Sequence, residues 1–150
     1  MQDTSKSCSD EQQSAEGIIA DIVESRVQCK LDRNVRVDIS DGVHIEPDLY
    51  SEKDRIICEI FAHIGSLKVG QQHKISQDLL KMLLLEKSKG VEYRKAIVIV
   101  DDSVEKYLNW KSFIAESIRQ FGIEVIRINL PDEISEGIQK AQKRQVMINA

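Results

Sequence analysis

Several features that would assign a chain to a class at once are scarce or absent in this sequence. Among its 150 residues there are three cysteines and two prolines, and aromatic residues make up 5%. Cys8, Cys29 and Cys58 are odd in number and widely spaced, which argues against a disulfide framework and against a zinc site. We expect Cys58 to be a small core residue. No apolar run approaches the roughly 18 residues that a membrane helix needs.

The N-terminal residues 1–13 are polar and lack the apolar centre of a secretory signal. Hydrophobic residues make up 41% of the chain and charged residues 31%, as in ordinary globular proteins. The length is sufficient for one domain with a substantial core. We therefore expect a cytoplasmic protein, with a flexible tail at residues 1–14 and a single domain at residues 15–150.

The net charge of −4 is distributed unevenly. Residues 1–64 carry seven basic and fourteen acidic residues, whereas residues 65–95 carry seven basic and three acidic ones. A basic segment that follows acidic residues is typical of a metal-binding centre beside a surface that contacts a nucleic-acid backbone. A solvated, lysine-rich helix end is the alternative interpretation of the same segment.

Periodicity predicts an alternation of helices and strands. Apolar residues recur at three- and four-residue intervals over 15–27, which indicates a helix. Alternating patterns predict strands at 34–40 and 43–48, joined by a turn at Asp41-Gly42. The later elements are expected in the order strand, helix, strand, helix, strand, helix, at residues 55–64, 71–87, 95–100, 104–121, 124–130 and 131–145. A three-stranded β-meander followed by βαβ crossovers predicts an α/β fold, a mixed central sheet with helices on both faces.

Two carboxylates stand out in this scheme. Asp48 follows Pro47 at the end of the second predicted strand, and Glu59 lies inside the mostly apolar third strand. A carboxylate at a strand bend and another on the next strand can hold a hard divalent cation by oxygen ligands. Such a cation favours phosphodiester hydrolysis, because it polarises a phosphoryl oxygen and lowers the pKa of a bound water.

This element order, with Pro-Asp at the second strand and a glutamate on the third, resembles the PD-(D/E)XK nuclease superfamily, which has the restriction-endonuclease-like fold. The resemblance covers roughly residues 15–130. It implies that Asp48 and Glu59 bind Mg²⁺ or Mn²⁺, with the main-chain carbonyl of Ile60 as a further ligand. It also implies a helical glutamate, for which Glu16 is the natural match and Glu24 the weaker one. A helix-start carboxylate favoured by the helix dipole is the alternative interpretation of Glu16.

The sequence departs from this family at Phe61, where the pattern places a lysine that orients the attacking water. Some members supply this lysine from the following helix, and Lys74 is placed to do so. A narrow polar stripe on this otherwise apolar helix contains Lys74, Gln77, Asp78 and Lys81, within about 100° of one another. Because a helix that is apolar nearly all round should be largely buried, the stripe faces either water or a cleft. In the second case Lys74 is catalytic.

The implied substrate is nucleic acid, with DNA favoured over RNA. The residues expected to contact its backbone without reading sequence are Lys68, Gln72, Lys81, Lys87, Lys89, Arg94 and Lys95. His63 shares a strand face with Glu59, and His44 shares one with Asp48. Each histidine is either a phosphate or metal contact or a structural hydrogen-bonding residue.

Other interpretations compete with a nuclease. The glycine spacing of Gly65–Gly70 is that of a phosphate-binding loop, but Gln71-Gln72 replaces the residues that would contact phosphate and Mg²⁺. Asp101-Asp102 after an apolar strand is explained by helix capping. With Phe61 in the lysine position, the chain could also be an inactive nuclease-like domain that binds DNA or protein, since fold does not fix function.

A larger complex or a homodimer is also consistent with so short a chain. The aromatic and apolar residues that suggest a dimer patch on the helix predicted at 104–121 are Tyr107, Trp110, Phe113 and Ile114. At helical spacing such residues more often belong to the core.

Overall fold

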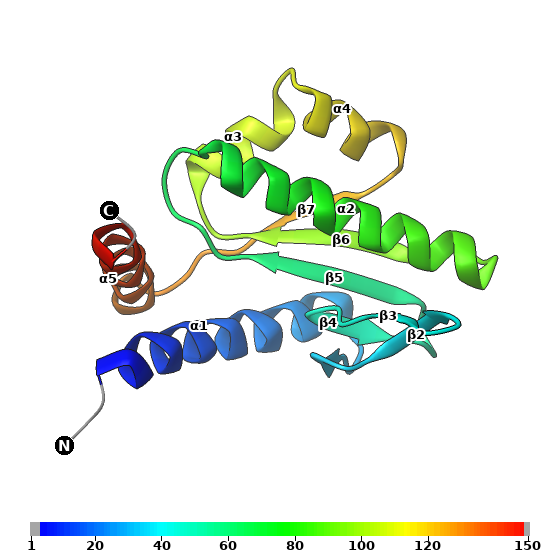
Figure 1. Ribbon diagram of the computed structural model, residues 1–150, viewed down its shortest axis with the longest axis horizontal. Coiled ribbons are helices and arrows are strands. Elements are labelled where there is room, and N and C mark those ends of the chain that lie inside the picture. Colours follow the sequence, from blue (N-terminus) through cyan, green and yellow to red (C-terminus); the bar gives the residue numbers. More distant parts are fainter. Residues whose placement is uncertain (1–3, 149–150) are drawn as a thin grey trace.

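The computed structural model describes the backbone of residues 4–148 and the side chains of residues 15–148. Its central element is a five-stranded mixed sheet in the order β1-β4-β5-β6-β7 (Figure 1). The strands of this sheet are β1 (Asp32–Arg33), β4 (Leu49–Ser51), β5 (Ile56–Phe61), β6 (Arg94–Ile99) and β7 (Glu124–Arg127). β5 pairs with β4 antiparallel and with β6 parallel, and β6 pairs with β7 parallel. The predicted mixed sheet is confirmed.

Helices cover both faces of this sheet, as the sequence predicted (Figure 1). The helices on one face are α2 (Val69–Lys89), α3 (Asp102–Asn109) and α4 (Phe113–Gln120). α1 (Thr4–Val27) packs on the other face, and α5 (Asp132–Ile148) lies against α1. Each face has its own apolar core. None of the helices within residues 4–148 combines the length and the hydropathy required to cross a membrane.

The central strand β5 is buried along its whole length. Because side chains alternate in a strand, Ile57, Glu59 and Phe61 face α2. Ile57 and Phe61 accordingly belong to the core on the α2 side. Cys58 belongs to the α1 side and is fully buried, which confirms it as a core residue. Glu59 is therefore a carboxylate placed between the sheet and α2.

The predicted three-stranded meander is wrong. β2 (Val37–Ser40) and β3 (Val43–Ile45) form a separate two-stranded sheet, although they are joined at the expected Asp41-Gly42 turn. The strand that pairs with β5 is instead β4, which begins directly after Asp48. Pro47 explains the break, because it lacks the N–H that a strand ladder needs and fixes its own φ. The chain therefore leaves the hairpin and enters the main sheet at this proline.

Two predicted helices differ in their limits. The helix expected at 104–121 is two helices, and the Oγ atom of Ser112 begins the second by accepting a hydrogen bond from the N–H of Ala115 (3.0 Å). α1 begins at Thr4 instead of residue 15, so its backbone includes most of the segment for which a tail was expected. Residues 1–3 and the side chains before Ala15 lie outside the described part.

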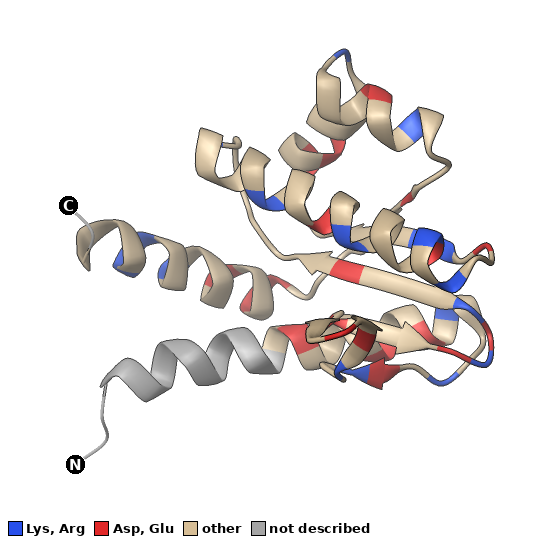
Figure 2. Cartoon of the chain, turned by 45° about the vertical axis from the view of Figure 1, so that its right-hand side comes forward, with Lys and Arg blue, Asp and Glu red and all other residues tan. Residues whose placement is uncertain are grey.

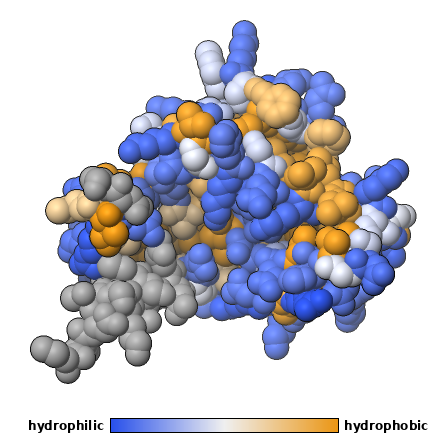
Figure 3. All heavy atoms as spheres, in the orientation of Figure 1, coloured by the Kyte–Doolittle hydropathy of each residue, from blue (hydrophilic) through white to orange (hydrophobic). Residues whose placement is uncertain are grey.

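Some residues expected in the core are exposed. Leu80 and Leu84 of α2 are 65% and 41% exposed, so this helix is less buried than its composition indicates. Trp110 and Phe113, at the junction of α3 and α4, are 72% and 83% exposed, whereas Ile114 beside them is buried. Figure 3 shows hydrophobic side chains at the surface in the region of α2 and α4. The core interpretation of Trp110 and Phe113 is therefore wrong.

Candidate functional site

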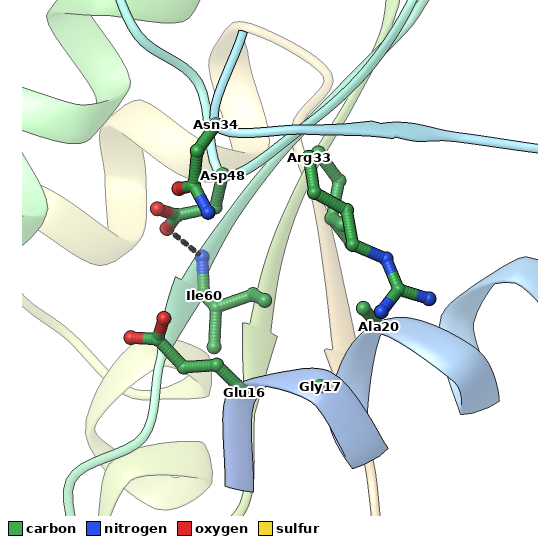
Figure 4. A pocket seen from close by; sticks show the side chains of 8 residues that line it. Glu16, Gly17, Ala20, Arg33, Asn34, Asp48 and Ile60 are labelled. Carbon is green, nitrogen blue, oxygen red and sulfur yellow. Dashed lines mark hydrogen bonds between the residues drawn. The ribbon is translucent and has the colours of Figure 1, made fainter. Parts of the chain in front are cut away.

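Asp48 is fixed between the two sheets by hydrogen bonds. Its Oδ2 atom accepts a hydrogen bond from the N–H of Ile60 on β5 (2.7 Å; Figure 4). Its main-chain oxygen accepts another from the N–H of Asn34 (3.2 Å). The half-buried carboxylate is thereby held against Ile60, near the end of the central strand β5.

Glu59 is 3% exposed, and its Oε1 atom has no hydrogen-bond partner in the part of the chain that the structure describes. Burial is the largest of the effects that raise the pKa of Glu59 to about 9. The negative charges of Asp48 and Asp78 and a hydrogen bond with Asp48 act in the same direction, whereas Lys81 opposes them. The structure therefore brings the carboxyl groups of Asp48 and Glu59 together, as the sequence predicted.

Glu16 approaches Asp48 from the α1 side of the sheet, whereas Glu59 faces α2. In Figure 4 its carboxyl group, carried by α1, points toward that of Asp48. Burial and the charge of Asp48 raise the pKa of Glu16, and Lys74 lowers it. Because α1 begins at Thr4, Glu16 is well inside the helix and its interpretation as a helix-start carboxylate is wrong. Glu24, the weaker candidate, instead accepts hydrogen bonds from Arg33 and from the N–H of Leu31.

Two adjoining pockets lie beside these carboxylates, and the buried Glu59 lines neither of them. The first, of about 240 Å³, is lined by Glu16, Gly17, Ala20, Arg33, Asn34, Asp48, Leu49 and Ile60. The second, of about 290 Å³, is lined by Ala15, Glu16, Ile60, Phe61, Ala62, His63, Gln71, Lys74, Ile138, Gln142 and Gln145. Glu16 and Ile60 line both, so the two pockets form one cleft. We call it the acidic cleft.

The polar stripe of α2 is partly buried and partly exposed, and Lys74 is the member of it that lines this cleft. Asp78 is 4% exposed, and its Oδ1 atom lies 3.7 Å from Nζ of Lys81. Burial raises the pKa of Asp78, although the charges of Lys74 and Lys81 lower it. Lys74 is exposed and lines the second pocket. The amine of Lys74 can therefore reach into the cleft.

Phe61 follows Glu59 by two residues on β5 and carries no charge. It is 4% exposed, belongs to the core on the α2 side, and its ring centroid lies 5.7 Å from that of His63. This side chain supplies packing and no charge. Lys74 and Lys81 of the neighbouring helix bring positive charge to the same region.

Several predicted nucleic-acid contacts lie elsewhere. Lys87 follows Lys74 by 13 residues, roughly 20 Å of helix, and Lys89 lies beyond it. Arg94 and Lys95 begin β6, at the end of the sheet opposite the acidic cleft. Arg94 is paired with Glu124 and the buried Lys95 with Glu86. These four basic residues are not brought to the cleft, and Figure 2 shows basic residues spread along α2 instead of gathered at one end.

Lys68 and Gln72, by contrast, lie at the start of α2, close to the cleft. The two histidines differ. Nε2 of His63 lies 3.1 Å from the main-chain oxygen of Ser66, and His63 also lines the second pocket. His44 lies on the hairpin, 3.7 Å from Glu46, which favours its structural interpretation.

Sequence reasoning did not assign to the site four residues that the structure places there. Asn34 and Arg33 line the first pocket, and Asn34 adopts a left-handed backbone (φ 52°) that asparagine tolerates. Gln142 of α5 exchanges two hydrogen bonds of 2.9 Å with the main chain of Ile64. Only Asp78 had a sequence signal, since it belongs to the polar stripe of α2. No local pattern links Gln142 to a strand 78 residues earlier.

No three His, Cys, Asp or Glu side chains within residues 15–148 are arranged to hold a metal ion by themselves. Mg²⁺, however, usually keeps several waters and binds through one or two carboxylates. The unpartnered buried oxygen of Glu59 and the raised pKa values of Glu16, Glu59 and Asp78 indicate excess negative charge that a divalent cation would compensate. Asp48 and Glu59 therefore fit a hydrated divalent cation.

No protein-family model matches the chain, and no curated protein or solved structure is significantly similar to it.

Proposed function

We propose that this protein is a metal-dependent nuclease that hydrolyses phosphodiester bonds of DNA, in preference to RNA. The observation that carries the proposal is that the buried carboxyl group of Glu59 lies against that of Asp48, which lines the acidic cleft as Lys74 does. Two neighbouring carboxylates and an amine are the groups that cation-assisted phosphoryl transfer requires.

The arrangement of elements also supports a restriction-endonuclease-like fold. A helix precedes the antiparallel β4 and β5, and α2 then connects β5 to the parallel β6. Asp48 stands at the start of β4 and Glu59 on β5, which is the relation that the PD-(D/E)XK superfamily uses. The fold assignment is part of the proposal and rests on this order and on these two positions.

Each residue of the cleft then has a defined task. When bound, Mg²⁺ or Mn²⁺ would polarise a phosphoryl oxygen and lower the pKa of a coordinated water. Asp48 and Glu59 would hold the cation, and the main-chain carbonyl of Ile60 and the carboxylate of Glu16 would be further ligands. Because Glu59 is protonated up to about pH 9, cation binding must displace its proton.

The positive charges belong to α2 in this proposal. Lys74 takes the part of the lysine that Phe61 does not provide, by stabilising negative charge that develops on the phosphate. Lys68 and Gln72, at the start of the same helix, contact the backbone of the bound strand.

The test is plasmid cleavage with Mg²⁺ or Mn²⁺. The wild type should cut, EDTA should stop cutting, and Asp48→Ala, Glu59→Ala and Lys74→Ala should each lower the rate about 100-fold or more. Glu124→Gln is a matched control, because it removes a carboxylate from an ion pair with Arg94 that lies outside the cleft. A folded wild type that cuts neither DNA nor RNA, or unchanged cutting by Asp48→Ala, contradicts the proposal.

A second candidate function is favoured by one observation, the burial of Phe61 in the core. A nuclease-like domain without the strand lysine could bind DNA or a protein partner and lack catalysis. It would bind DNA in the presence of Mg²⁺ without cutting it, and Lys74→Ala would change only the affinity. Cleavage that depends on Lys74 excludes this second candidate.

A further inference from the structure

α2 carries a buried carboxylate to which the proposed reaction gives no task. Asp78 is 4% exposed, and aspartate is almost never buried this deeply unless it is paired. It follows Lys74 by four residues and precedes Lys81 by three, so all three side chains lie on one face of the helix. Glu59, with its unpartnered oxygen, faces this helix from β5.

The contact between Asp78 and Lys81 differs from a purely structural ion pair that joins α2 to β6. Glu86 and Lys95 lie 2.6 Å apart, and the Lys95 side chain is 7% exposed, so that amine is fully occupied by its partner. Nζ of Lys81 lies 3.7 Å from Asp78, and its side chain is 31% exposed. The amine of Lys81 is thus held near Asp78 and still partly open to solvent.

A lysine on a long flexible stem must lose rotamer freedom before it can act at a fixed point. A buried carboxylate between two lysines restricts both stems, since each amine is attracted to the same fixed charge. Lys74 and Lys81 both lower the pKa of Asp78, and Lys81 lowers that of Glu59, so the two lysines and the buried carboxyl groups belong to one group of interacting charges.

We propose that Asp78 is a positioning residue of the acidic cleft, which holds the amines of Lys74 and Lys81 over Asp48 and Glu59. In this way α2 replaces the strand lysine that Phe61 does not supply. The inference rests on the proposed nuclease function. In it Asp78 orients the two lysines and contacts neither the cation nor the substrate.

The first experiment compares Asp78→Asn with Glu86→Gln, which removes from α2, outside the cleft, the carboxylate that pairs with Lys95 of β6. Asp78→Asn should lower kcat for plasmid cleavage about 10- to 100-fold, since small misplacements of a catalytic group have effects of this order. Its KM and its Kd for Mn²⁺, measured by calorimetry, should stay within about twofold of the wild type. Glu86→Gln should keep kcat while losing stability, and Asp78→Glu should restore part of kcat.

A double-mutant cycle tests whether Asp78 acts through Lys74. In the Lys74→Ala background, Asp78→Asn should cause little further loss of kcat, because the two residues then belong to one unit. Wild-type kcat in Asp78→Asn overturns the proposal. So does a loss of Mn²⁺ affinity in proportion to the loss of rate, which would make Asp78 a cation ligand.

A second measurement separates failure of this inference from failure of the nuclease proposal. NMR relaxation of the lysine side chains needs no activity. Lys74 and Lys81 should be more restricted than Lys87 in the wild type, and should become as mobile as Lys87 in Asp78→Asn. If the wild type cuts no nucleic acid, the nuclease proposal fails and the relaxation data still decide the role of Asp78. Equal mobility in wild type and variant overturns that role even in an active enzyme.

Discussion

Glu59 is an acidic residue in a strand whose other residues are all buried and mainly apolar. Removing a carboxylate from water disfavours its charged form, and the nearby charges of Asp48 and Asp78 add to this effect. Such a group weakens the folded protein at neutral pH, unless a cation compensates it. Perturbed carboxylates of this kind are therefore more often explained by function than by stability.

The dependence of stability on pH follows from this shift. The pKa of Glu59 rises from its ordinary 4.5 to about 9 in the folded protein, so between these values only the folded state keeps the proton. The free energy of unfolding should therefore fall as pH rises from 4.5 to 9, by at most about 1.4 kcal/mol per pH unit. Glu16 and Asp78, whose pKa values are also raised, act in the same direction.

Urea unfolding in EDTA at pH 5, 7 and 9 measures this slope, and Glu59→Gln should flatten it. Adding Mn²⁺ at pH 7 should raise the midpoint of the wild type and not that of the variant, because only the folded wild type binds the cation. Equal slopes for the two proteins would show that Glu59 is ionised in the folded state at neutral pH.

Among the elements, α5 closes the second pocket and is attached to the end of the central strand. The amide of Gln142 accepts a hydrogen bond from the N–H of Ile64 and donates one to its main-chain oxygen, each of 2.9 Å. Both main-chain groups lie just after β5, where the strand ladder has ended. Besides the packing of α5 on α1, these two hydrogen bonds tie this wall of the cleft to the central strand.

Gln142→Ala should lower the free energy of unfolding by about 1–3 kcal/mol, because it leaves two half-buried main-chain groups without partners. Gln145→Ala is the matched control, since Gln145 lines the same pocket but is exposed, and its effect should stay within about 0.5 kcal/mol. Chemical denaturation measures both. Equal losses for the two variants would mean that the hydrogen bonds of Gln142 do not hold α5.

On the scale of the whole molecule, the net charge of −4 and the acidic cleft oppose the approach of a phosphate backbone. Many basic residues outside the cleft are already paired, as Arg94 is with Glu124 and Lys95 with Glu86. Apart from Arg33, which is paired with Asp21 and Glu24, the basic residues near the cleft within residues 15–148 are Lys68, Lys74 and Lys81. Binding of DNA should therefore require a divalent cation, and it should involve few phosphate contacts.

Fluorescence anisotropy of labelled DNA tests this with Ca²⁺, which allows binding to be measured apart from cleavage. EDTA should abolish binding, and about three phosphate contacts predict a slope near −3 for log K against log salt. Lys68→Ala should reduce the magnitude of this slope by about one. The double variant Lys87→Ala/Lys89→Ala is the control and should leave it unchanged. A slope of smaller magnitude in that control would mean that the DNA contacts the whole length of α2. Strong binding in EDTA would mean that binding does not require the cation.

Much of the fold and the pair Asp48 and Glu59 could be predicted from the sequence, because they depend on local patterns. Period-two and period-3.6 spacing defined most strands and helices, and Asp41-Gly42 defined the hairpin turn. The predicted limits were wrong where a single residue ended one element or began another inside a continuous pattern. Pro47 ended a strand three residues early, and Ser112 began a new helix inside a predicted one.

Only the tertiary structure decided which distant residues meet. It turned the polar stripe of α2 toward Glu59, placed Gln142 against Ile64, and left Lys87 and Lys89 roughly 20 Å along the helix from the cleft. It also exposed Trp110 and Phe113, which helical spacing favoured as core. Backbone geometry makes the periods of helices and strands visible in a sequence, whereas the side of an element that meets a neighbour is chosen by packing between segments far apart in the chain.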